Sequence, residues 1–315
     1  MITTQQLQED FTSGLNEFLS NYPESTLFGP IRYLLSLGGK RIRPVLALAV
    51  CNSEGASSKE AMPASLTVEL FHNFTLMHDD IMDHAPLRRG RETVHEKFSE
   101  NAAILSGDAL FTAAYQAIEL SSSSALPQLL KLVNKTSMEV CEGQQLDLDF
   151  ESKTDVNEEM YLEMIRLKTS VLLAASCSMG AISAGATDER VRLWYQFGEK
   201  LGLAFQIQDD YLDTFGLENL TGKQVGGDIL ADKKTYLLIH AESKGPMPST
   251  ENCSPEEKIE IIKSEMSSRG SDLAAKNLMK KYSDDAAKAL DLLALNPSTK
   301  TWFEELLFSV TERVS

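Results

Sequence analysis

Residues 71–83 read Phe-His-Asn-Phe-Thr-Leu-Met-His-Asp-Asp-Ile-Met-Asp. The run is mostly apolar before its acids and contains no Gly or Pro, so it predicts a helix. On that helix Asp79 and Asp83 lie one turn apart on one face, with Asp80 beside them. Like charges at this spacing destabilise a helix by roughly 0.2–0.5 kcal/mol, and a divalent cation bound through carboxylate oxygen would offset that repulsion. Because acidic clusters also occur on solvated helix faces, this motif alone leaves both interpretations open.

The same acidic spacing returns at residues 205–213, which read Phe-Gln-Ile-Gln-Asp-Asp-Tyr-Leu-Asp. One glutamine and three aspartates of this run share one face of a helix: Gln206, Asp209, Asp210 and Asp213. Buried carboxylates need partners, and two such helices facing each other would form a cage suited to Mg²⁺. Mg²⁺ prefers to share its shell with substrate phosphates. The repeat therefore predicts two carboxylate helices that hold a diphosphate through magnesium.

The composition limits the class of partner. The chain has 315 residues and is 43% hydrophobic, which is enough for a large core. A formal net charge of −16 argues against nucleic acid as a partner, because phosphate backbones need clustered cations. Any anionic substrate must therefore be met by a local basic patch.

Several features favour a cytoplasmic protein with no transmembrane segment. The four cysteines are widely spaced and form no C-x-x-C pair, which fits a reduced compartment and not a metal-thiolate site. The N-terminus lacks the basic and apolar regions of a signal peptide. The apolar run from Val171 to Ala186 is broken by serines and is too short to span a bilayer.

The spacing of apolar residues predicts an all-α protein. Helices are expected, in chain order, over residues 5–21, 31–37, 44–51, 61–83, 101–120, 126–145, 158–184, 188–213 and 233–243. Strand-like alternation is scarce. Residues 243–255 are expected to form an exposed loop, and helical patterning resumes at Glu256. No shift in composition marks a boundary, so we expect one helical domain over residues 1–315.

Three basic elements could meet an anionic substrate. Gly38-Gly39-Lys40-Arg41-Ile42-Arg43-Pro44 puts three cations at the start of a helix, where glycines let the backbone approach an anion. Arg88-Arg89-Gly90-Arg91 follows the first acidic motif closely, so its guanidinium groups could reach a phosphate that metal ions also touch. The third element is a set of lysines, each of which alone is better interpreted as a surface residue: Lys168, Lys223, Lys233 and Lys234.

Together these motifs resemble those of the trans-isoprenyl diphosphate synthases, the head-to-tail prenyltransferases that make geranyl, farnesyl and geranylgeranyl diphosphates. The resemblance covers roughly residues 30 to 240. It includes two further short motifs and a closing run: Gly143-Gln144-x-x-Asp147, Leu167-Lys168-Thr169, and the segment from Gly222-Lys223 through Gly227-Asp228-Ile229 to Lys233-Lys234-Thr235. It implies a single-domain helical bundle of the isoprenoid synthase type with a central active-site cavity, assembled as a homodimer.

The resemblance also implies roles for individual residues. Asp79 and Asp83 would bind two Mg²⁺ ions with support from Asp80, and Asp209 would bind a third, while Asp210 and Asp213 would act through water and indirect contacts. The residues with catalytic roles would be Asp79, Asp80, Asp83, Asp209, Lys168 and Lys233. The allylic diphosphate would be held by Arg88, Lys168, Thr169, Gln206, Lys223 and Lys233. Isopentenyl diphosphate would be held by Lys40, Arg43, His72 and Arg89. His78 faces another way and is expected to be structural.

Product length depends in this family on the residues four and five places before the first acidic motif, which here are Thr75 and Phe74. One small and one aromatic residue indicate an intermediate stop. Phe71 lies one turn further, about 12 Å from Asp79 along the helix, and could form a second floor. We expect a C20 product, with C15 as the alternative.

Three other functions compete with this one. A terpene cyclase shares the fold and the first acidic motif but needs no isopentenyl site, so the Lys40 and Arg43 cluster argues against it. A non-catalytic partner subunit would typically have lost aspartates, and none is lost here. The pair His78-Asp79 could indicate a metal-dependent phosphohydrolase, but the other histidines lack a supporting ligand pattern.

Overall fold

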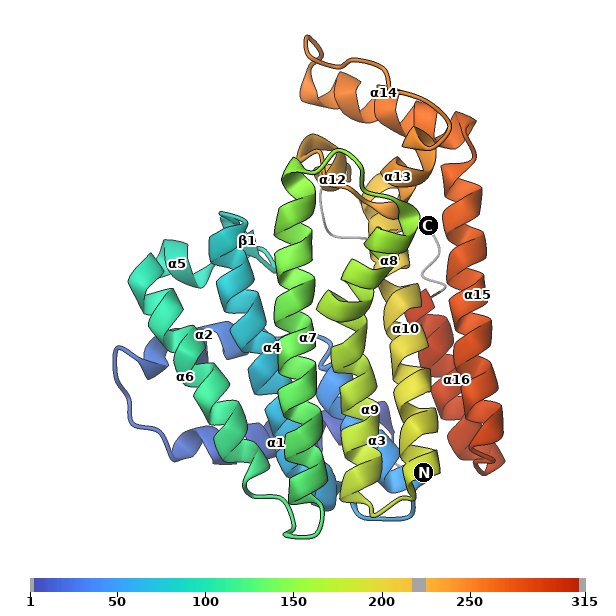
Figure 1. Ribbon diagram of the computed structural model, residues 1–315. Coiled ribbons are helices and arrows are strands. Elements are labelled where there is room, and N and C mark those ends of the chain that lie inside the picture. Colours follow the sequence, from blue (N-terminus) through green and yellow to red (C-terminus); the bar gives the residue numbers. More distant parts are fainter. Residues whose placement is uncertain (1–2, 217–224, 312–315) are drawn as a thin grey trace. The chain divides into compact units, whose positions relative to one another are not determined.

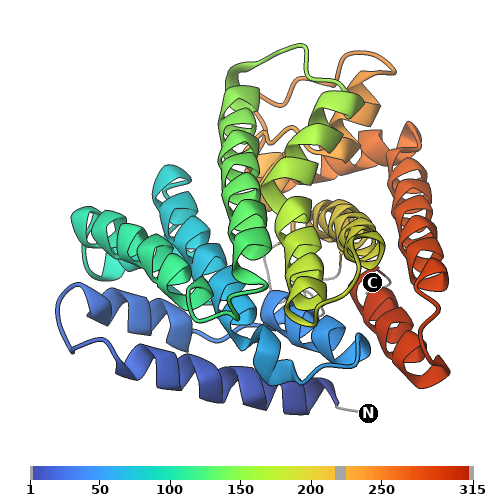
Figure 2. The same cartoon turned by 60° about the horizontal axis from the view of Figure 1, so that its bottom comes forward.

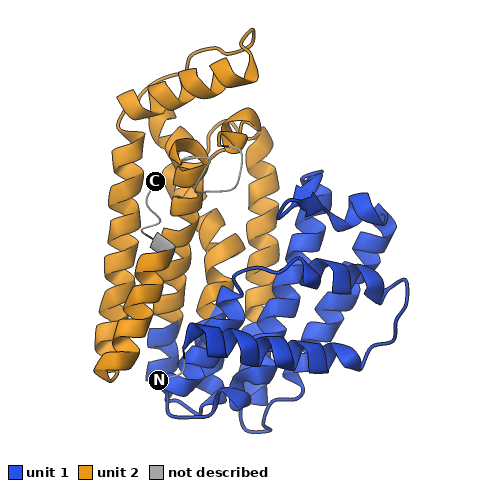
Figure 3. Ribbon diagram, turned by 180° about the vertical axis from the view of Figure 1, so that it is seen from behind, with its two compact units in different colours: residues 1–134, 175–194 blue, residues 135–174, 195–315 orange. Residues whose placement is uncertain are grey.

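The structure, a computed structural model, describes residues 3–216 and 225–311. By Cα proximity the chain divides into two compact units, shown in Figure 3. Unit 1 comprises Met1–Asn134 and Ala175–Trp194, and unit 2 comprises Lys135–Ala174 and Tyr195–Ser315. The regular elements of the described residues are helices apart from one short hairpin, which confirms the predicted all-α class. The single domain expected over residues 1–315 stays a prediction.

Figure 1 labels the elements in chain order. Those up to residue 118 are α1 (Thr4–Ser20), α2 (Phe28–Ser36), α3 (Ile42–Ser53), η1 (Ser58–Ala61), α4 (Met62–Met82), β1 (Leu87–Arg88), β2 (Arg91–Glu92), α5 (Val94–Lys97) and α6 (Glu100–Ile118). Those that follow are α7 (Leu126–Ser152), α8 (Glu158–Ile165), η2 (Arg166–Ser170), α9 (Val171–Ser183), α10 (Asp188–Phe215), α12 (Gly227–Leu230), α13 (Tyr236–Glu242), α14 (Pro255–Ser268), α15 (Ser271–Leu292) and α16 (Pro297–Thr311).

Side-chain caps set several helix starts. The Thr3 hydroxyl accepts from the Gln6 backbone N–H before α1, and the Gln6 side chain accepts from the Thr3 N–H. Ser254 and Glu257 form the same reciprocal pair at α14. Each pair satisfies two backbone N–H groups that a helix start otherwise leaves without a partner.

In unit 1, α4 is the central helix. It packs against α3 and α6, and Figures 1 and 2 both show α6 alongside it. Four aromatic side chains join α4 to α6: Phe71, Phe74, Phe111 and Tyr115. Their rings bury large apolar areas and fix how the two helices pack. The end of α4 that carries the acidic motif is therefore held on a rigid support.

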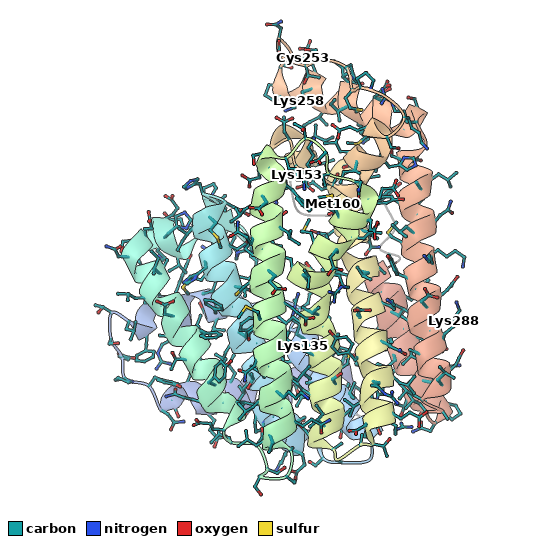
Figure 4. The ribbon with its side chains drawn as sticks, viewed as in Figure 1. Lys135, Lys153, Met160, Cys253, Lys258 and Lys288 are labelled. Carbon is teal, nitrogen blue, oxygen red and sulfur yellow. The ribbon has the colours of Figure 1, made fainter. Side chains whose placement is uncertain are left out.

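In unit 2, the helices α7, α8, α10 and α15 lie side by side in Figures 1 and 2. Buried residues such as Tyr161, Ile207 and Leu237 belong to one apolar core there. The helix α14 packs against α12, α13 and α15. Lys258, labelled on α14 in Figure 4, places its Nζ 2.7 Å from Asp232 Oδ1 and 3.5 Å from the Leu230 carbonyl oxygen.

Three local features differ from the sequence prediction. The helix expected over 158–184 is interrupted by the π-helical turn η2 between α8 and α9. The helix α7 continues to Ser152, seven residues beyond the predicted end at residue 145. The basic element Arg88-Arg89-Gly90-Arg91, for which the sequence predicted no strand, spans the hairpin β1–β2. The spacing of apolar residues encodes none of these three features.

One described stretch, Glu158–Ser183, is long and apolar enough to cross a membrane by length and composition. Its most apolar window is 83% buried inside the protein, as expected for a core helix. The stretch is therefore weak support for a membrane span.

We expect Gly180→Ala to destabilise the protein by about 1–3 kcal/mol, because overpacking forces a backbone shift. A Cβ at this position on α9 would lie 2.3 Å from the Ala47 carbonyl oxygen of α3. Gly29→Ala in α2 is the matched control, since nothing lies within 4 Å of its Cβ position. Chemical denaturation measures both, and equal unfolding free energies for the two variants would contradict the close approach of α9 to α3.

Candidate functional site

The first acidic motif lies at the C-terminal end of α4. Asp80 is only 1% exposed, whereas Asp79 is half-buried and Asp83, the residue after the helix, is exposed. The motif therefore has one carboxylate inside the protein and two nearer its surface.

Arg88 is the partner of the buried Asp80. Its Nε donates to Asp80 Oδ2 at 2.8 Å, and its Nη2 donates to Oδ1 at 2.6 Å. Burial raises the pKa of Asp80, and these hydrogen bonds act in the opposite direction. A two-point contact of this kind fixes both groups in one geometry. Asp80 therefore orients Arg88, one of the residues predicted to bind the allylic diphosphate.

The hairpin turn sets the direction of Arg89. Leu87 pairs with Glu92 and Arg88 with Arg91, so Arg89 and Gly90 are the two turn residues. Their φ angles are 54° and 73°, and two positive values are what the tight type I′ hairpin turn requires. The turn brings the Arg89 guanidinium against Gly39, where a Cβ would lie 2.7 Å from Nη2. Gly39 has a φ of 132°, which favours glycine, and a side chain there would displace the guanidinium.

The residues predicted to hold isopentenyl diphosphate gather in this region of unit 1. The Arg43 Nη1 lies 3.2 Å from His72 Nε2, and Arg89 lies against Gly39, next to the exposed Lys40. The structure thus brings Arg43, His72 and Arg89 into one basic cluster, and Lys40 is the chain neighbour of Gly39 at its edge.

His72 is a neutral acceptor within that cluster. Its burial, followed by the charges of Arg43, Arg88, Arg89 and Arg41, holds the imidazole pKa well below its usual value. Because a guanidinium only donates, Nε2 accepts from Arg43, and the single ring proton lies on Nδ1. His72 therefore orients Arg43 without adding charge.

Arg41, the third cation of the glycine-rich element, has a structural role. Its Nη1 forms an ion pair with Glu69, which is 3% exposed, and its Nη2 donates to the Leu35 carbonyl at 2.6 Å. The Asn73 side chain donates to the same Glu69 carboxylate at 3.0 Å. Arg41 itself has a φ of 51°. This buried network fixes the loop that carries Lys40 and Arg43, and no local sequence pattern indicated it.

The residues predicted to limit product length lie beside the aromatic cluster of α4 and α6. The Phe74 ring centroid lies 5.2 Å from that of Phe111 and 5.6 Å from that of the buried Phe71. The Thr75 hydroxyl donates to the His72 carbonyl at 2.8 Å. Sequence analysis did not single out Phe111, although its spacing from Tyr115 along one helix face was a usable signal.

His78 packs as a structural residue, in line with the sequence interpretation. Its Nε2 lies 3.1 Å from the Ile104 carbonyl oxygen, and a Cβ at Gly107 would lie 2.2 Å from the same nitrogen. The imidazole therefore fills the gap that Gly107 leaves between α4 and α6.

The second acidic motif on α10 also buries its middle aspartate. Asp210 is 5% exposed, its Oδ2 accepts from the Tyr161 hydroxyl, and its Oδ1 accepts from Gln206 Nε2 at 3.1 Å. Burial and the nearby Asp228 raise the pKa of Asp210 to about 8, although the two hydrogen bonds act in the opposite direction. The Thr169 hydroxyl donates to Gln206 Oε1 at 3.0 Å, so Thr169, Gln206 and Asp210 form one chain. Tyr161 has no counterpart in the predicted set.

Asp213 anchors the segment that follows the motif. Its Oδ1 accepts from the Asp228 backbone N–H at 2.9 Å, and its carbonyl accepts from the Gly226 N–H at 2.7 Å. Gly226 has a φ of 90°, which favours glycine. The indirect role that the resemblance implied for Asp213 thus includes holding the chain before Lys233.

A pocket of about 130 Å³ in unit 2 contains most of the remaining predicted residues. Its polar lining consists of Asp147, Tyr161, Lys168, Thr169, Gln206, Asp209, Asp210, Asp228, Lys233, Lys234 and Thr235. Lys168 Nζ donates to Asp147 Oδ2 at 2.6 Å. Lys223 lies outside the described residues. The pocket thus combines carboxylates with lysines, as binding of a phosphate through a cation requires.

The donor set of this pocket fits magnesium. Asp209, Asp210 and Asp228 offer carboxylate oxygen only, which is the ligand type that Mg²⁺ takes. Within residues 3–216 and 225–311, no three acidic, histidine or cysteine side chains converge as a complete metal cage. An ion held here would complete its shell with water or phosphate oxygen, as Mg²⁺ commonly does.

Comparison with known proteins gives consistent matches. A family model described as polyprenyl synthetase matches residues 24–270. A geranylgeranyl diphosphate synthase from Methanosarcina mazei is 40% identical over 235 residues, which cover 74% of this chain and 72% of that protein. The crystal structure of a geranylgeranyl pyrophosphate synthase is 41% identical, with a TM-score of 0.94 and coverage of 100% of both chains. A polyprenyl synthase from Caulobacter crescentus CB15, complexed with calcium and isoprenyl diphosphate, is 29% identical, with a TM-score of 0.85 and coverage of 99% of this chain and 97% of that one.

We expect the His72 imidazole to remain neutral throughout the range from pH 6 to 8, which nitrogen-15 NMR of the ring can measure. Because its pKa is lowered by folding, the unfolded chain takes up a proton at this site first as the pH falls. The stability that the neutral ring contributes is therefore complete above about pH 6.5 and is lost progressively below it.

His72→Gln, which retains an acceptor but does not titrate, is the control for this stability profile. Below about pH 6.5, the unfolding free energy of the wild type should fall relative to that of the variant. An imidazole that titrates near its ordinary pKa in the folded protein would contradict the buried basic cluster.

Proposed function

Because this chain belongs to the polyprenyl synthetase family, we propose that it is a prenyltransferase that joins isopentenyl diphosphate to an allylic diphosphate, head to tail. The products would be a short trans-polyprenyl diphosphate and inorganic diphosphate. The observation that carries this proposal is the pocket of unit 2, which Lys168, Asp209 and Lys233 line together. Carboxylates for metal ions and fixed cations for phosphate are the two requirements for diphosphate departure.

The lysines of the pocket would hold the allylic diphosphate. Lys168 is positioned by Asp147, and Lys233 follows the segment that Asp213 anchors. Arg88, oriented by Asp80, would add a guanidinium. Fixed cations of this kind stabilise the negative charge that develops as the carbon–oxygen bond breaks, without reorganising at that moment.

The basic cluster of Lys40, Arg43 and Arg89, together with neutral His72, would hold the diphosphate of the second substrate. This diphosphate stays attached throughout the reaction, so its site needs firm binding without activation. A local group of cations suits this use, because the chain as a whole has a formal net charge of −16 and does not attract an anion.

Metal ions would be held by Asp79, Asp83 and Asp209. Magnesium bound there supplies positive charge to the departing diphosphate. The presence of calcium and isoprenyl diphosphate in the Caulobacter crescentus relative supports a divalent cation at this site. About three ions would serve each active site, in line with the number of carboxylate ligands assigned to them.

The bond-forming step would follow departure of the allylic diphosphate. The allylic carbon that loses diphosphate becomes a cation, and the double bond of isopentenyl diphosphate attacks it. Loss of one proton, which the departing diphosphate can accept, leaves a chain five carbons longer. Aromatic residues such as Phe71 and Phe74 would keep water away from the cation.

The product would be C20, with C15 as the alternative length. Phe71, Phe74 and Phe111 pack against one another, so the aromatic cluster would form a wall beside the middle of α4, about two helical turns before the acids. The geranylgeranyl names of the Methanosarcina mazei relative and of the similar crystal structure support the C20 product.

Assembly and location are further parts of the proposal. We infer a homodimer, because unit 1 exposes apolar side chains near α6 that a second copy could cover: Phe98, Ile104 and Leu105, which are 44%, 38% and 59% exposed. A cytoplasmic location is supported by the four cysteines, all of which are free thiols.

A terpene cyclase or a non-catalytic partner subunit has less support. A cyclase would have no use for the basic cluster around Arg43 and His72. A non-catalytic subunit would have no need for the carboxylates of Asp79, Asp83 and Asp209.

The function is tested by incubating the protein with Mg²⁺, isopentenyl diphosphate and each allylic starter, followed by chromatography of the products. We expect condensation, and we expect Asp209→Asn to lower kcat/KM by about 100-fold or more, because it removes a charged oxygen ligand. Asp149→Asn is the matched control, since Asp149 is exposed on α7 and bonds Gln145 at the surface. Diphosphate release without condensation would favour a cyclase, and a folded protein with no turnover would favour a partner subunit.

We expect Phe74→Ala to lengthen the product by one or more five-carbon units, because it removes part of the aromatic wall. Phe308→Ala is the control, since this ring is 59% exposed on α16 and lies outside the Phe71, Phe74 and Phe111 cluster. Mass spectrometry of the dephosphorylated products measures both variants. An unchanged product from Phe74→Ala would assign the limit to Phe71 or Phe111 instead.

A further inference from the structure

The π-helical turn η2 carries two of the residues that line the pocket of unit 2. It spans Arg166–Ser170, and the Val171 N–H donates to the Arg166 carbonyl five residues back. Turns of this kind are rare and are found frequently at functional sites. Here the turn presents Lys168 and Thr169 to the pocket.

Two helices approach this turn so closely that only glycine fits at the contacts. A Cβ at Gly143 on α7 would lie 2.2 Å from the Lys168 backbone nitrogen and 2.7 Å from the Leu167 carbonyl carbon. A Cβ at Gly202 on α10 would lie 2.6 Å from the Ser170 Cα. Glycine within a helix costs about 1 kcal/mol relative to alanine, so its use at two contacts with one turn calls for a compensating gain.

That gain is visible one helical turn further along each helix. Four residues after Gly143, Asp147 binds Lys168 Nζ at 2.6 Å. Four residues after Gly202, Gln206 accepts from the Thr169 hydroxyl at 3.0 Å. Residues four apart lie on the same helix face, so each helix offers the turn a glycine and then a polar partner.

We propose that Gly143 and Gly202 are positioning residues for the allylic-diphosphate site. Their missing side chains let α7 and α10 lie against the backbone of the turn, which places Asp147 and Gln206 within reach of Lys168 and Thr169. The inference rests on the proposed function, because it takes Lys168 and Thr169 as residues that meet the allylic substrate.

A methyl group at either glycine displaces the turn. Moving a backbone nitrogen from 2.2 Å to an ordinary contact distance from a Cβ requires a shift on the order of 1 Å. The Asp147 and Lys168 pair and the Thr169 and Gln206 pair span 2.6 Å and 3.0 Å, so a shift of that size breaks or weakens them. A misplacement of about 1 Å can lower the rate roughly 100-fold.

The experiment is steady-state kinetics of Gly143→Ala and Gly202→Ala in the full chain, with geranyl diphosphate and isopentenyl diphosphate varied separately. We expect kcat/KM for geranyl diphosphate to fall by about 100-fold, while KM for isopentenyl diphosphate stays within about threefold of wild type. Gly198→Ala is the matched control, because its Cβ would lie 2.7 Å from the Ala174 Cα, on α9 beyond the turn. It should lose stability and retain both KM values.

A double-mutant cycle separates positioning from general damage. If Gly143 acts through Lys168, Gly143→Ala combined with Lys168→Gln should cost no more in kcat/KM for geranyl diphosphate than Lys168→Gln alone. Multiplied losses, or equal effects on both substrates, would overturn the proposal. If Gly143→Ala does not fold, the same double-mutant cycle can be measured with Gly202→Ala and Thr169→Val, on the opposite side of the turn.

The proposed function and this inference can fail separately. A wild-type protein that condenses the two substrates, with glycine variants whose kinetics for geranyl diphosphate match those of Gly198→Ala, overturns the inference alone. A wild-type protein that performs no condensation overturns both.

Discussion

Carboxylates at the ends of buried helices require partners, and this constraint governs the arrangement of both acidic motifs. In each motif the middle aspartate enters the protein: Asp80 is 1% exposed and Asp210 is 5% exposed. Arg88 satisfies the first, and Tyr161 with Gln206 satisfies the second. Because an unpaired buried charge is strongly unfavourable, these partners hold their helix ends firmly. The outer aspartates are thereby presented from rigid supports, which suits them to bind metal ions.

Positive charge is distributed by a different rule. Four arginines lie in or beside the basic cluster of unit 1: Arg41, Arg43, Arg88 and Arg89. Two of them form ion pairs, Arg41 with Glu69 and Arg88 with Asp80. His72, which lies among them, remains neutral. Paired arginines fix the loop and the hairpin, and Arg43 and Arg89 with nearby Lys40 are left to meet an anion. The ion pairs of Arg41 and Arg88 with carboxylates lower the mutual repulsion among these cations.

Local patterns were sufficient to predict the helices and the acids, and insufficient for the groups that position them. The helix around Asp79 was predicted within two residues of α4, because its apolar spacing and the absence of Gly or Pro are local properties. The hairpin at Arg89 and the π-helical turn at Lys168 are local, but the spacing of apolar residues does not encode them. The Glu69 partner of Arg41 lies 28 residues away in the chain. Tyr161 was missed for the same reason, since nothing near it in the sequence marks a contact with Asp210. The motifs predict which side chains act, whereas tertiary contacts determine where those side chains point.

The helix α14 carries none of the motifs, yet it contacts the segment that leads to Lys233. Lys258 holds Asp232, which has a φ of 52° directly before Lys233, and Ile259 packs where Gly226 has no side chain. The segment that carries Lys233 is thus held in place by contacts with α14. Substitutions in α14 can therefore shift the segment that carries Lys233, and two proteins with identical motifs need not place this lysine identically.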